Sequence, residues 1–286
     1  MSHKYAVVTP VKDEENFFPK TVASMLKQET KPEKWIIVND GSTDRTGEII
    51  RELEKEHSWI VGLHKSPTRE RKPGGEFVLN EGIAMLNIDD YDFIVRMDGD
   101  LSFDGDYFKK LFEEFDKNPK LGLASGVCFA PNGDELIEEK HPRFHTRGPS
   151  KTYRSVCFKQ LGGLKSNLGW DTVDEVKLNM LGWQTYSFPE LKIVHLRKTQ
   201  TASGTLNGFK NRGLACYYAG YHPLFLLARA AKLSFSKPYF FAGVATLYGY
   251  ISGFLKKLPR VDDLKLIAYT QEQQLNRLLG KQTIWR

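Results

Sequence analysis

Short apolar stretches alternate with longer amphipathic ones from Tyr5 to Phe129. A strand inside a parallel sheet is apolar throughout, whereas a helix on its face is apolar on one side only. The short stretches predict strands at Tyr5–Val11, Lys34–Asn39, Trp59–Leu63, Asp92–Met97 and Leu121–Phe129. The longer stretches predict helices at Phe17–Lys27, Thr43–His57, Glu76–Leu86 and Tyr107–Phe115. Strands joined through helices indicate right-handed crossovers, and so an α/β fold with a mainly parallel sheet flanked by helices.

The alternation ends after Phe129, where polar loops begin. Further helices are predicted at Lys151–Gln160 and Val173–Leu181, and a further strand at Thr185–Val194. Beyond Thr199, aromatic and small residues dominate, and the chain then becomes polar and helical from Val261 to Leu279. We therefore expect one domain at residues 1–199, with an internal division near residue 130, and a helical appendage at residues 200–286.

The composition excludes several classes of protein. The 286 residues are 41% hydrophobic and 27% charged, as in a folded globular chain. The three cysteines, Cys128, Cys157 and Cys216, lie far apart, which favours reduced thiols in a cytosolic protein over a zinc site or a disulfide framework. Lys and Arg number 41 against 35 Asp and Glu, and the net charge of +6 suits phosphates, nucleic acid or lipid headgroups alike.

Polar residues follow the first two predicted strands, where a parallel sheet binds its ligands. The first strand runs into Thr9-Pro10-Val11-Lys12-Asp13-Glu14-Glu15, and the second into Asp40-Gly41-Ser42-Thr43-Asp44. Asp40 is placed to accept a hydrogen bond from a base N–H or a ribose hydroxyl. In the alternative interpretation, Ser42 or Thr43 caps the next helix and Gly41 makes the turn, with no ligand involved.

Two carboxylates, Asp98 and Asp100, follow the strand Asp92–Met97. Spaced one residue apart, they can reach one divalent cation that bridges two phosphates, because hard cations prefer oxygen ligands. A hairpin turn at Asp98-Gly99 is the structural alternative. It is disfavoured because no alternating strand returns, and the following residues predict a helix instead.

Two later positions are also candidates. Asp171 opens a predicted helix, where it could cap the first turn, act as a general base toward a hydroxyl, or do both. His195 follows the strand Thr185–Val194 and is followed by Arg197 and Lys198. It is either a structural hydrogen-bonding residue or a ligand that completes a metal site, while Arg197 or Lys198 meets a phosphate.

Together these segments resemble the inverting glycosyltransferases of family 2, which have the GT-A fold. The resemblance covers roughly Tyr5 to Arg197 and rests on the order of several motifs. The family's P-x-x-N-E-E motif corresponds to Pro10–Glu15 with Asp13 for the Asn, and its V-D-D-G-S-x-D motif to Val38–Asp44 with Asn39 for the first Asp. Its D-x-D motif is Asp98-Gly99-Asp100.

The later motifs of the family match more loosely. Its G-x-D-x-D or E-D motif carries the catalytic base, and counting back from Gly182-Trp183 assigns that base to Asp171. The second family acid would then fall on Val173, so Asp174 and Glu175 remain rivals. The segment Arg69–Gly75 resembles the family's basic loop, and Asn80-Glu81-Gly82 its N-x-G.

The resemblance implies a single in-line displacement that moves a sugar from a nucleoside diphosphate sugar to a saccharide or lipid-linked hydroxyl, in cell-surface polysaccharide or glycolipid synthesis. Residues 1–130 would bind the donor, and residues 131–199 would hold the acceptor and the base. The implied metal is Mg or Mn on Asp100, helped by His195. The implied donor contacts are Thr9, Pro10, Glu14, Asp40, Arg71, Lys72, Asp98 and Arg197.

Two other functions remain open from the sequence. Asp98 and Asp100 resemble the nucleophile and acid/base of haloacid dehalogenase-type phosphatases. That motif normally follows the first strand, however, and Ser102 departs from its usual Thr or Val. A non-catalytic protein that binds nucleotide sugars is the other alternative.

Membrane contact is indicated by an uncharged run from Pro238 to Leu255, flanked by Lys237 and Lys256-Lys257. The run sits at the lower limit of the ~17–25 residues that span a bilayer, and its Gly and Tyr residues weaken it further. We expect it to pack on the domain or to lie in the membrane interface at the cytoplasmic face. Because the cations gather near Arg71 and in this C-terminal region, no nucleic acid partner is expected.

Overall fold

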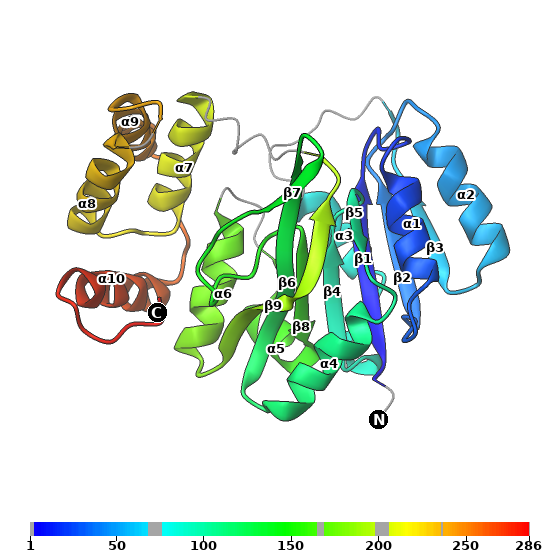
Figure 1. The fold of residues 1–286 in the computed structure, drawn as a ribbon. Coiled ribbons are helices and arrows are strands. Elements are labelled where there is room, and N and C mark those ends of the chain that lie inside the picture. Colours follow the sequence, from blue (N-terminus) through cyan, green and yellow to red (C-terminus); the bar gives the residue numbers. More distant parts are fainter. Residues whose placement is uncertain (1–2, 68–75, 165–168, 198–205, 236, 286) are drawn as a thin grey trace. The chain divides into compact units, whose positions relative to one another are not determined.

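The computed structural model of the chain describes residues 3–67, 76–164, 169–197, 206–235 and 237–285. It divides into two compact units, the first made of residues 1–165 with 182–197 and the second of residues 166–181 with 198–286 (Figure 1). The predicted α/β fold with C-terminal helices is confirmed. The division also groups one segment before residue 199 with the C-terminal helices, while the boundary expected at residue 199 stays a prediction.

The first unit is built on one mixed sheet with the strand order β3-β2-β1-β4-β8-β6-β9-β5, and β7 pairs with β6. Its first half is parallel throughout, and each of its strands lies within a residue of its predicted bounds. These four strands are β1 (Tyr5–Val11), β2 (Lys34–Asn39), β3 (Ile60–His64) and β4 (Phe93–Met97). Their carboxyl ends meet at one edge of the sheet, where ligands bind in such folds.

Antiparallel strands enter in the other half of the sheet. The long strands β6 (Leu121–Asn132) and β9 (Gln184–His195) are parallel, while β8 (Ser150–Arg154) runs antiparallel between β4 and β6. The prediction of a helix from Lys151 is therefore wrong in its first part, and α5 begins only at Ser155 (Ser155–Leu161). A lysine in the middle of a buried strand conceals the apolar pattern by which a strand is recognised, and Lys151 is fully buried.

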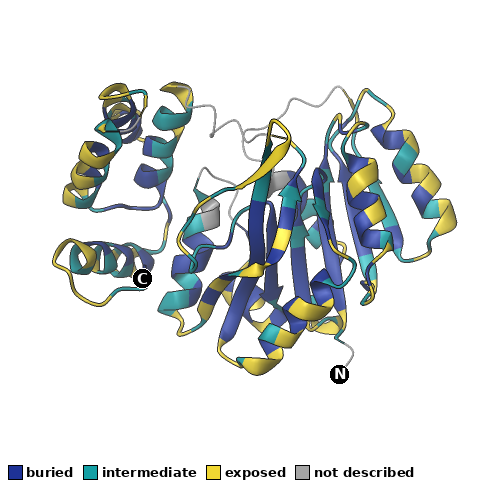
Figure 2. Cartoon of the chain, viewed as in Figure 1, coloured by how far each residue is buried: buried dark blue, intermediate teal, exposed yellow. Residues whose placement is uncertain are grey.

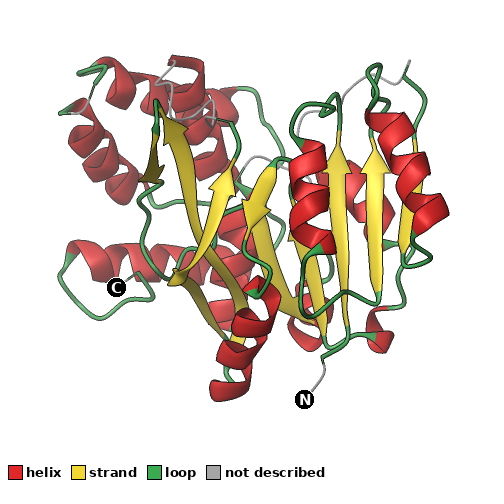
Figure 3. Ribbon diagram, turned by 45° about the vertical axis from the view of Figure 1, so that its right-hand side comes forward, coloured by secondary structure: helices red, strands yellow, loops and turns green. Residues whose placement is uncertain are grey.

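Two short strands complete the sheet. β5 (Leu101–Phe103) pairs antiparallel with β9, and β7 (Glu135–Glu138) forms a hairpin with β6 (Figure 3). No strand returns to pair with β4 after Asp98-Gly99-Asp100, so the hairpin alternative is wrong, as expected. The short strand β5 itself was not predicted, and it pairs with β9.

Helices cover both faces of the sheet. α1 (Phe18–Leu26), α2 (Thr46–Glu56) and α4 (Tyr107–Lys117) bury their apolar sides with Tyr5, Val7 and Phe93 in one hydrophobic core (Figure 2). α3 (Glu76–Ile83) lies on the opposite face. A Cβ at Gly82 would come within 2.6 Å of Val8 and 2.7 Å of Val38, so glycine lets α3 approach β1 and β2.

The second unit is helical, as predicted for the C-terminal appendage. Its helices are α6 (Trp170–Met180), α7 (Leu206–Tyr218), α8 (Pro223–Ser234), α9 (Phe241–Leu255) and α10 (Leu264–Leu278). An ion pair of 3.7 Å between Lys177 and Asp263 links α6 to the start of α10. Among the described residues, none of the helices has the length and the apolar character needed to cross a membrane.

Candidate active site

The loops that follow β1 and β2 are tied together by their own polar side chains. Oδ1 of Asp13 accepts a hydrogen bond from the backbone N of Thr43 at 2.8 Å, and Oγ of Ser42 accepts one from the backbone N of Asp13 at 3.0 Å. Oε2 of Glu15 likewise accepts from the backbone N of Arg45 at 3.1 Å. Acidic side chains of the first motif thus hold the loop of the second motif in place.

The start of α2 differs from the capping predicted for Ser42 or Thr43. The helix begins at Thr46, and its N-cap residue, Arg45, makes no side-chain cap. Oδ1 of Asp44 accepts a hydrogen bond from the backbone N of Thr46 at 3.0 Å, and Ser42 and Thr43 pair with Asp13 instead. The structure therefore assigns the polar residues after Gly41 to the link between the two loops.

Three predicted donor contacts lie at these strand ends in different environments. Thr9 is fully buried, and its Oγ1 accepts a hydrogen bond from Nε1 of Trp35 at 2.9 Å. Pro10 and Asp40 are partly exposed, and the backbone N of Asp40 donates to the carbonyl of Val11 at 2.9 Å. Pro10 and Asp40 are thus accessible to a ligand, whereas the hydroxyl of Thr9 is already hydrogen-bonded to Trp35 in the core.

The loop Asp98–Asp100 connects β4 to β5 and is held in place by Val11 of β1 and Thr21 of α1. A Cβ at Gly99 would lie 2.4 Å from Cγ1 of Val11, so only glycine fits between the two carboxylates without a shift of the Val11 side chain. Oγ1 of Thr21, a buried residue of α1, lies 2.8 Å from the carbonyl oxygens of both Gly99 and Leu101. It also accepts a hydrogen bond from the backbone N of Leu101 at 3.0 Å. Sequence analysis missed Thr21, because no motif surrounds it.

Asp100 and His195 are brought together by the pairing of β5 with β9. Leu101 lies opposite His195 in this ladder, and the backbone N of Leu196 donates to the carbonyl of Asp100 at 2.8 Å. As a result, Nε2 of His195 lies 3.2 Å from Oδ2 of Asp100. Both side chains are buried, with 2% of Asp100 and 6% of His195 exposed.

Arg197 joins this pair to the first motif. Its Nε donates to Oδ2 of Asp100 at 2.6 Å, and its Nη2 donates to Oε1 of Glu14. Glu14 is buried, whereas the Arg197 side chain is half exposed and its guanidinium lies 5.9 Å from the ring centre of Phe17. One guanidinium thus bridges the carboxylates that follow β1 and β4.

Asp98 sits in a different electrostatic environment from Asp100. Burial raises the pKa of Asp98, although Arg96, whose Nη2 lies 2.8 Å from Oδ1 of Asp98, acts to lower it. Arg96 lies opposite the buried Lys151 in the β4–β8 ladder, so this side of the site carries two cationic residues at one register position.

The pKa values of Asp100, His195 and Glu14 are set by burial and by their mutual contacts. Burial opposes ionisation of Asp100, but the hydrogen bonds and charges of His195 and Arg197 prevail and lower its pKa. Burial likewise opposes protonation of His195, but Asp100 raises its pKa overall. Burial raises the pKa of Glu14, and the nearby Arg197 offsets part of this effect. The lowered pKa of Asp100 therefore depends on its contacts with His195 and Arg197.

Asp98, Asp100 and His195 have a donor set that fits a divalent metal ion. One ligand atom from each residue lies within 4.8 Å of the other two. Carboxylate oxygens suit Mg and Mn, and an imidazole nitrogen suits transition metals such as Zn. Nδ1 of His195 is buried and has no hydrogen-bond partner among the described residues. The predicted grouping of Asp100 with His195 is therefore present, and Asp98 joins it.

The remaining candidates lie on α6 or outside the described residues. Gly169, with φ of 88°, is the N-cap of α6, so Asp171 lies inside the first turn and the capping interpretation is wrong. The Asp171 side chain is not among those described. Its rivals Asp174 and Glu175 are both buried, and Oδ1 of Asp174 accepts a hydrogen bond from the backbone N of Glu175 at 2.7 Å. Arg71 and Lys72 lie outside the described residues.

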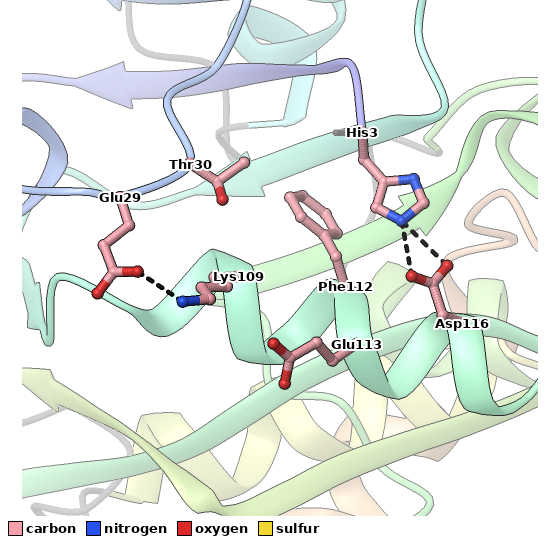
Figure 4. Close-up of a pocket in the computed structure, with 7 residues that line it drawn as sticks. All are labelled: His3, Glu29, Thr30, Lys109, Phe112, Glu113 and Asp116. Atoms are coloured by element: carbon pink, nitrogen blue, oxygen red, sulfur yellow. Dashed lines mark hydrogen bonds and ion pairs between the residues drawn. The ribbon is translucent and has the colours of Figure 1, made fainter. Parts of the chain in front are cut away.

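A pocket at the other end of the sheet offers different chemistry (Figure 4). Its polar residues already pair with one another, since Nζ of Lys109 lies 2.8 Å from Glu29 and Nε2 of His3 lies 3.0 Å from Asp116. His3 precedes β1, so this pocket lies at the amino end of the parallel strands and is separate from the cluster around Asp100. Its lining residues are His3, Glu29, Thr30, Lys109, Phe112, Glu113 and Asp116.

Comparison with known proteins identifies the family. The model of glycosyl transferase family 2 matches residues 6–168, more than half of the chain. The chain belongs to glycosyl transferase family 2. This membership argues against the phosphatase alternative. The position of Asp98 and Asp100 after the fourth strand of the chain, instead of the first, agrees with it.

Family 2 relatives resemble part of the chain. The chain is 38% identical over 106 residues to poly-beta-1,6-N-acetyl-D-glucosamine synthase of Staphylococcus epidermidis, covering 37% of this chain and 24% of the relative. It is 30% identical over 115 residues to the synthase of the same name from Staphylococcus aureus strain MSSA476, covering 40% of this chain and 26% of the relative. The chain thus spans about a quarter of the length of these relatives.

Solved structures share the fold over nearly the whole chain. The mannosyltransferase PcManGT from Pyrobaculum calidifontis, in complex with GDP-Man and Mn2+, matches with a TM-score of 0.60 and 15% identity, covering 98% of this chain and 81% of that chain. TarS 1-349 from S. aureus, in complex with UDP-GlcNAc, matches with a TM-score of 0.55 and 15% identity, covering 97% and 80%. At this identity the likeness establishes a fold like that of these transferases.

Proposed function

We propose that this family 2 glycosyltransferase moves a sugar from a nucleoside diphosphate sugar to an acceptor hydroxyl with inversion, and that the transfer depends on Mg or Mn. The observation that carries the proposal is the group of the partly exposed Asp98 with the buried Asp100 and His195, which lies beyond β4 at the ligand-binding edge of the sheet. A metal ion bound there would supply positive charge that stabilises the departing diphosphate.

The donor-binding roles are assigned to residues around this group. Asp40 and Pro10 are partly exposed at the ends of β2 and β1, where Asp40 can accept a hydrogen bond from the base or the ribose. Asp98 is proposed to accept from the ribose. Arg197 is half exposed and contacts Glu14 and Asp100, so its guanidinium can also turn toward the diphosphate. Arg71 and Lys72 are further proposed diphosphate contacts. Thr9 is proposed to contribute to donor binding from its buried position.

The proposed base is Asp171, with Asp174 and Glu175 as alternatives on the same helix. The base would take the proton from the acceptor hydroxyl as that oxygen attacks the anomeric carbon, while the bond to the diphosphate breaks on the opposite face. One in-line displacement of this kind inverts the configuration at the anomeric carbon.

The proposed acceptor is a saccharide or a lipid-linked saccharide in cell-surface polysaccharide synthesis. The support is the similarity to the Staphylococcus epidermidis synthase, which covers 37% of this chain. We also propose that the protein works at the cytoplasmic face of the membrane in peripheral contact with it.

The experiment is a binding and turnover screen with UDP-GlcNAc and GDP-mannose, each with and without Mn. We expect one donor to raise the melting temperature only when Mn is present, and to release its nucleoside diphosphate slowly in the absence of acceptor. Thermal stabilisation without release of nucleoside diphosphate from any donor, even with acceptor saccharides present, would favour the non-catalytic alternative.

A further inference from the structure

Most of the large apolar side chains of the helix α9 are exposed, and its buried residues are small with the exception of Tyr250. The exposed residues recur every three or four positions and so share one helix face. They are Phe241, Val244, Tyr248, Ile251, Phe254 and Leu255. The buried residues Ala242, Thr246, Gly249 and Gly253 follow the same spacing on another face. A helix of a water-soluble domain normally has the opposite arrangement.

Backbone contact with α7 prevents α9 from turning its apolar face inward. A Cβ at Gly249 would lie 2.0 Å from the carbonyl oxygen of Lys210, and one at Gly213 would lie 1.9 Å from that of Thr246. The two helices therefore meet backbone to backbone, with no space for a larger residue at either position. Glycine inside a helix costs about 1 kcal/mol relative to alanine, so this close contact has been favoured over helix propensity.

The charged residues in the sequence around α9 are all basic from Lys192 to Arg260. No Asp or Glu occurs between Glu190 and Asp262, although Lys and Arg recur throughout this stretch. Lys237 precedes α9, and Lys256 and Lys257 follow it, all three exposed. Along the side of the helix, Nζ of Lys210 lies 5.8 Å from the ring centre of Tyr248. An apolar face with cations at both ends is complementary to an anionic lipid surface.

We propose that the outer face of α9 is a bilayer-docking surface, which lies in the plane of an anionic membrane with its aromatic and aliphatic side chains in the boundary between headgroups and acyl chains. The helix has 15 residues, or about 22 Å at 1.5 Å per residue, which is shorter than the ~30 Å hydrocarbon core. It therefore lies on the membrane and does not cross it.

A lipid surface explains this face better than a second copy of the chain does. Two copies joined through α9 would bring Lys237, Lys256 and Lys257 of each close to those of the other, with no carboxylate in the same stretch to neutralise them. A bilayer containing acidic lipids supplies that negative charge. The inference deepens the peripheral membrane contact of the proposed function, because it specifies the residues that enter the lipid.

A fluorescent label on α9 tests the inference directly. Cys128, Cys157 and Cys216 are all buried, so a cysteine introduced at the surface can be labelled selectively. We would attach a polarity-sensitive dye to Val244→Cys and, as a matched control, to Glu52→Cys on the exposed side of α2. With phosphatidylglycerol vesicles at low salt, we expect a blue shift at position 244 and none at position 52. Phosphatidylcholine vesicles should reduce the shift because they carry no net negative charge. Salt at about 1 M NaCl should reduce it as well, because it screens charges beyond a few ångströms.

Two outcomes would overturn the inference. One is the absence of a shift at position 244 on any vesicle. The other is a shift without lipid that grows with protein concentration, which would assign the face to a second copy.

A binding test compares Val244→Glu with Ile251→Glu against a control pair, Leu136→Glu with Ile137→Glu, at similarly exposed positions of β7. We expect vesicle sedimentation to fall at least tenfold for the first pair only.

Donor turnover in lipid-free buffer, measured on the same preparations, keeps the two proposals apart. Turnover without vesicle binding would reject the docking surface alone. Vesicle binding without binding of any nucleotide sugar would reject the proposed function alone.

Discussion

Nε2 of His195 lies 3.2 Å from Oδ2 of Asp100, although the two residues are 95 positions apart in the chain. The short ladder between β5 and β9 causes this proximity, because it sets Leu101 opposite His195 and fixes both backbones. The second carboxylate of the D-x-D motif and the histidine therefore form one buried unit, which Arg197 connects to Glu14.

Removal of either member of this pair should weaken metal binding. We expect Asp100→Asn and His195→Ala each to lower the affinity for Mn at least tenfold, because each loses one candidate ligand of a three-residue set. A tenfold loss corresponds to about 1.4 kcal/mol. Titration of the apoprotein with Mn, followed by calorimetry or by the electron paramagnetic resonance of the free ion, measures the change.

The matched control for the metal-site variants is Asp104→Asn. Asp104 is an exposed carboxylate close in sequence that lies outside the cluster. Its substitution should leave Mn affinity unchanged. If Asp100→Asn and His195→Ala also bind Mn as the unmodified protein does, the metal site lies elsewhere.

The parallel half of the fold could be predicted from the sequence because each of its strands is a continuous apolar run. β1 and β2 have the predicted bounds, and β4 differs by one residue. β8 was missed because its buried Lys151 breaks the pattern, and β5 because three residues are too few to show a period. A buried lysine is tolerated only through tertiary contacts, which a local pattern does not contain.

The candidate site could be predicted in part for a similar reason. Asp98 and Asp100 follow an apolar strand, and His195 stands at the end of a further predicted strand, so their place at the sheet edge was expected. The bridge of Arg197 to Glu14 joins residues 183 positions apart, and the support of the Asp98–Asp100 loop by Thr21 crosses 78 to 80 positions. Neither contact leaves a spacing that a single sequence displays.

Loss of the Thr21 hydroxyl should disturb the Asp98–Asp100 loop. Thr21→Val keeps the shape but leaves the buried backbone N of Leu101 without its acceptor, which costs about 1–3 kcal/mol of folding stability. We also expect a weaker affinity for Mn, because the loop carries two of the three candidate ligands. Urea unfolding and Mn titration of the same variant measure both effects.

Thr21→Ser is the control, since it keeps the hydroxyl and should restore Mn affinity. A Thr21→Val protein that loses stability but binds Mn normally would show that Thr21 supports the core without positioning the site.

Gly99→Ala should destabilise the fold through a clash with β1. The new Cβ would lie 2.4 Å from Cγ1 of Val11, and overpacking of this kind costs about 1–3 kcal/mol. The second substitution Val11→Ala removes that methyl group and should recover part of the loss. Urea denaturation of both single variants and the double variant gives the coupling energy. Additive effects in the double variant would mean that the clash is relieved in another direction.

The base is tested by a series on α6. We expect Asp171→Asn to retain donor and Mn binding but to lower the rate of transfer by about 10²–10⁴-fold, because an amide does not take the acceptor proton. Donor affinity from calorimetry and the transfer rate at saturating donor separate the two properties.

The matched variants are Asp174→Asn and Glu175→Gln. Both should mainly lower the melting temperature, since both residues are buried and Asp174 binds the backbone of its neighbour. Normal transfer by Asp171→Asn, combined with a stable but inactive Asp174→Asn or Glu175→Gln, would move the base to that residue.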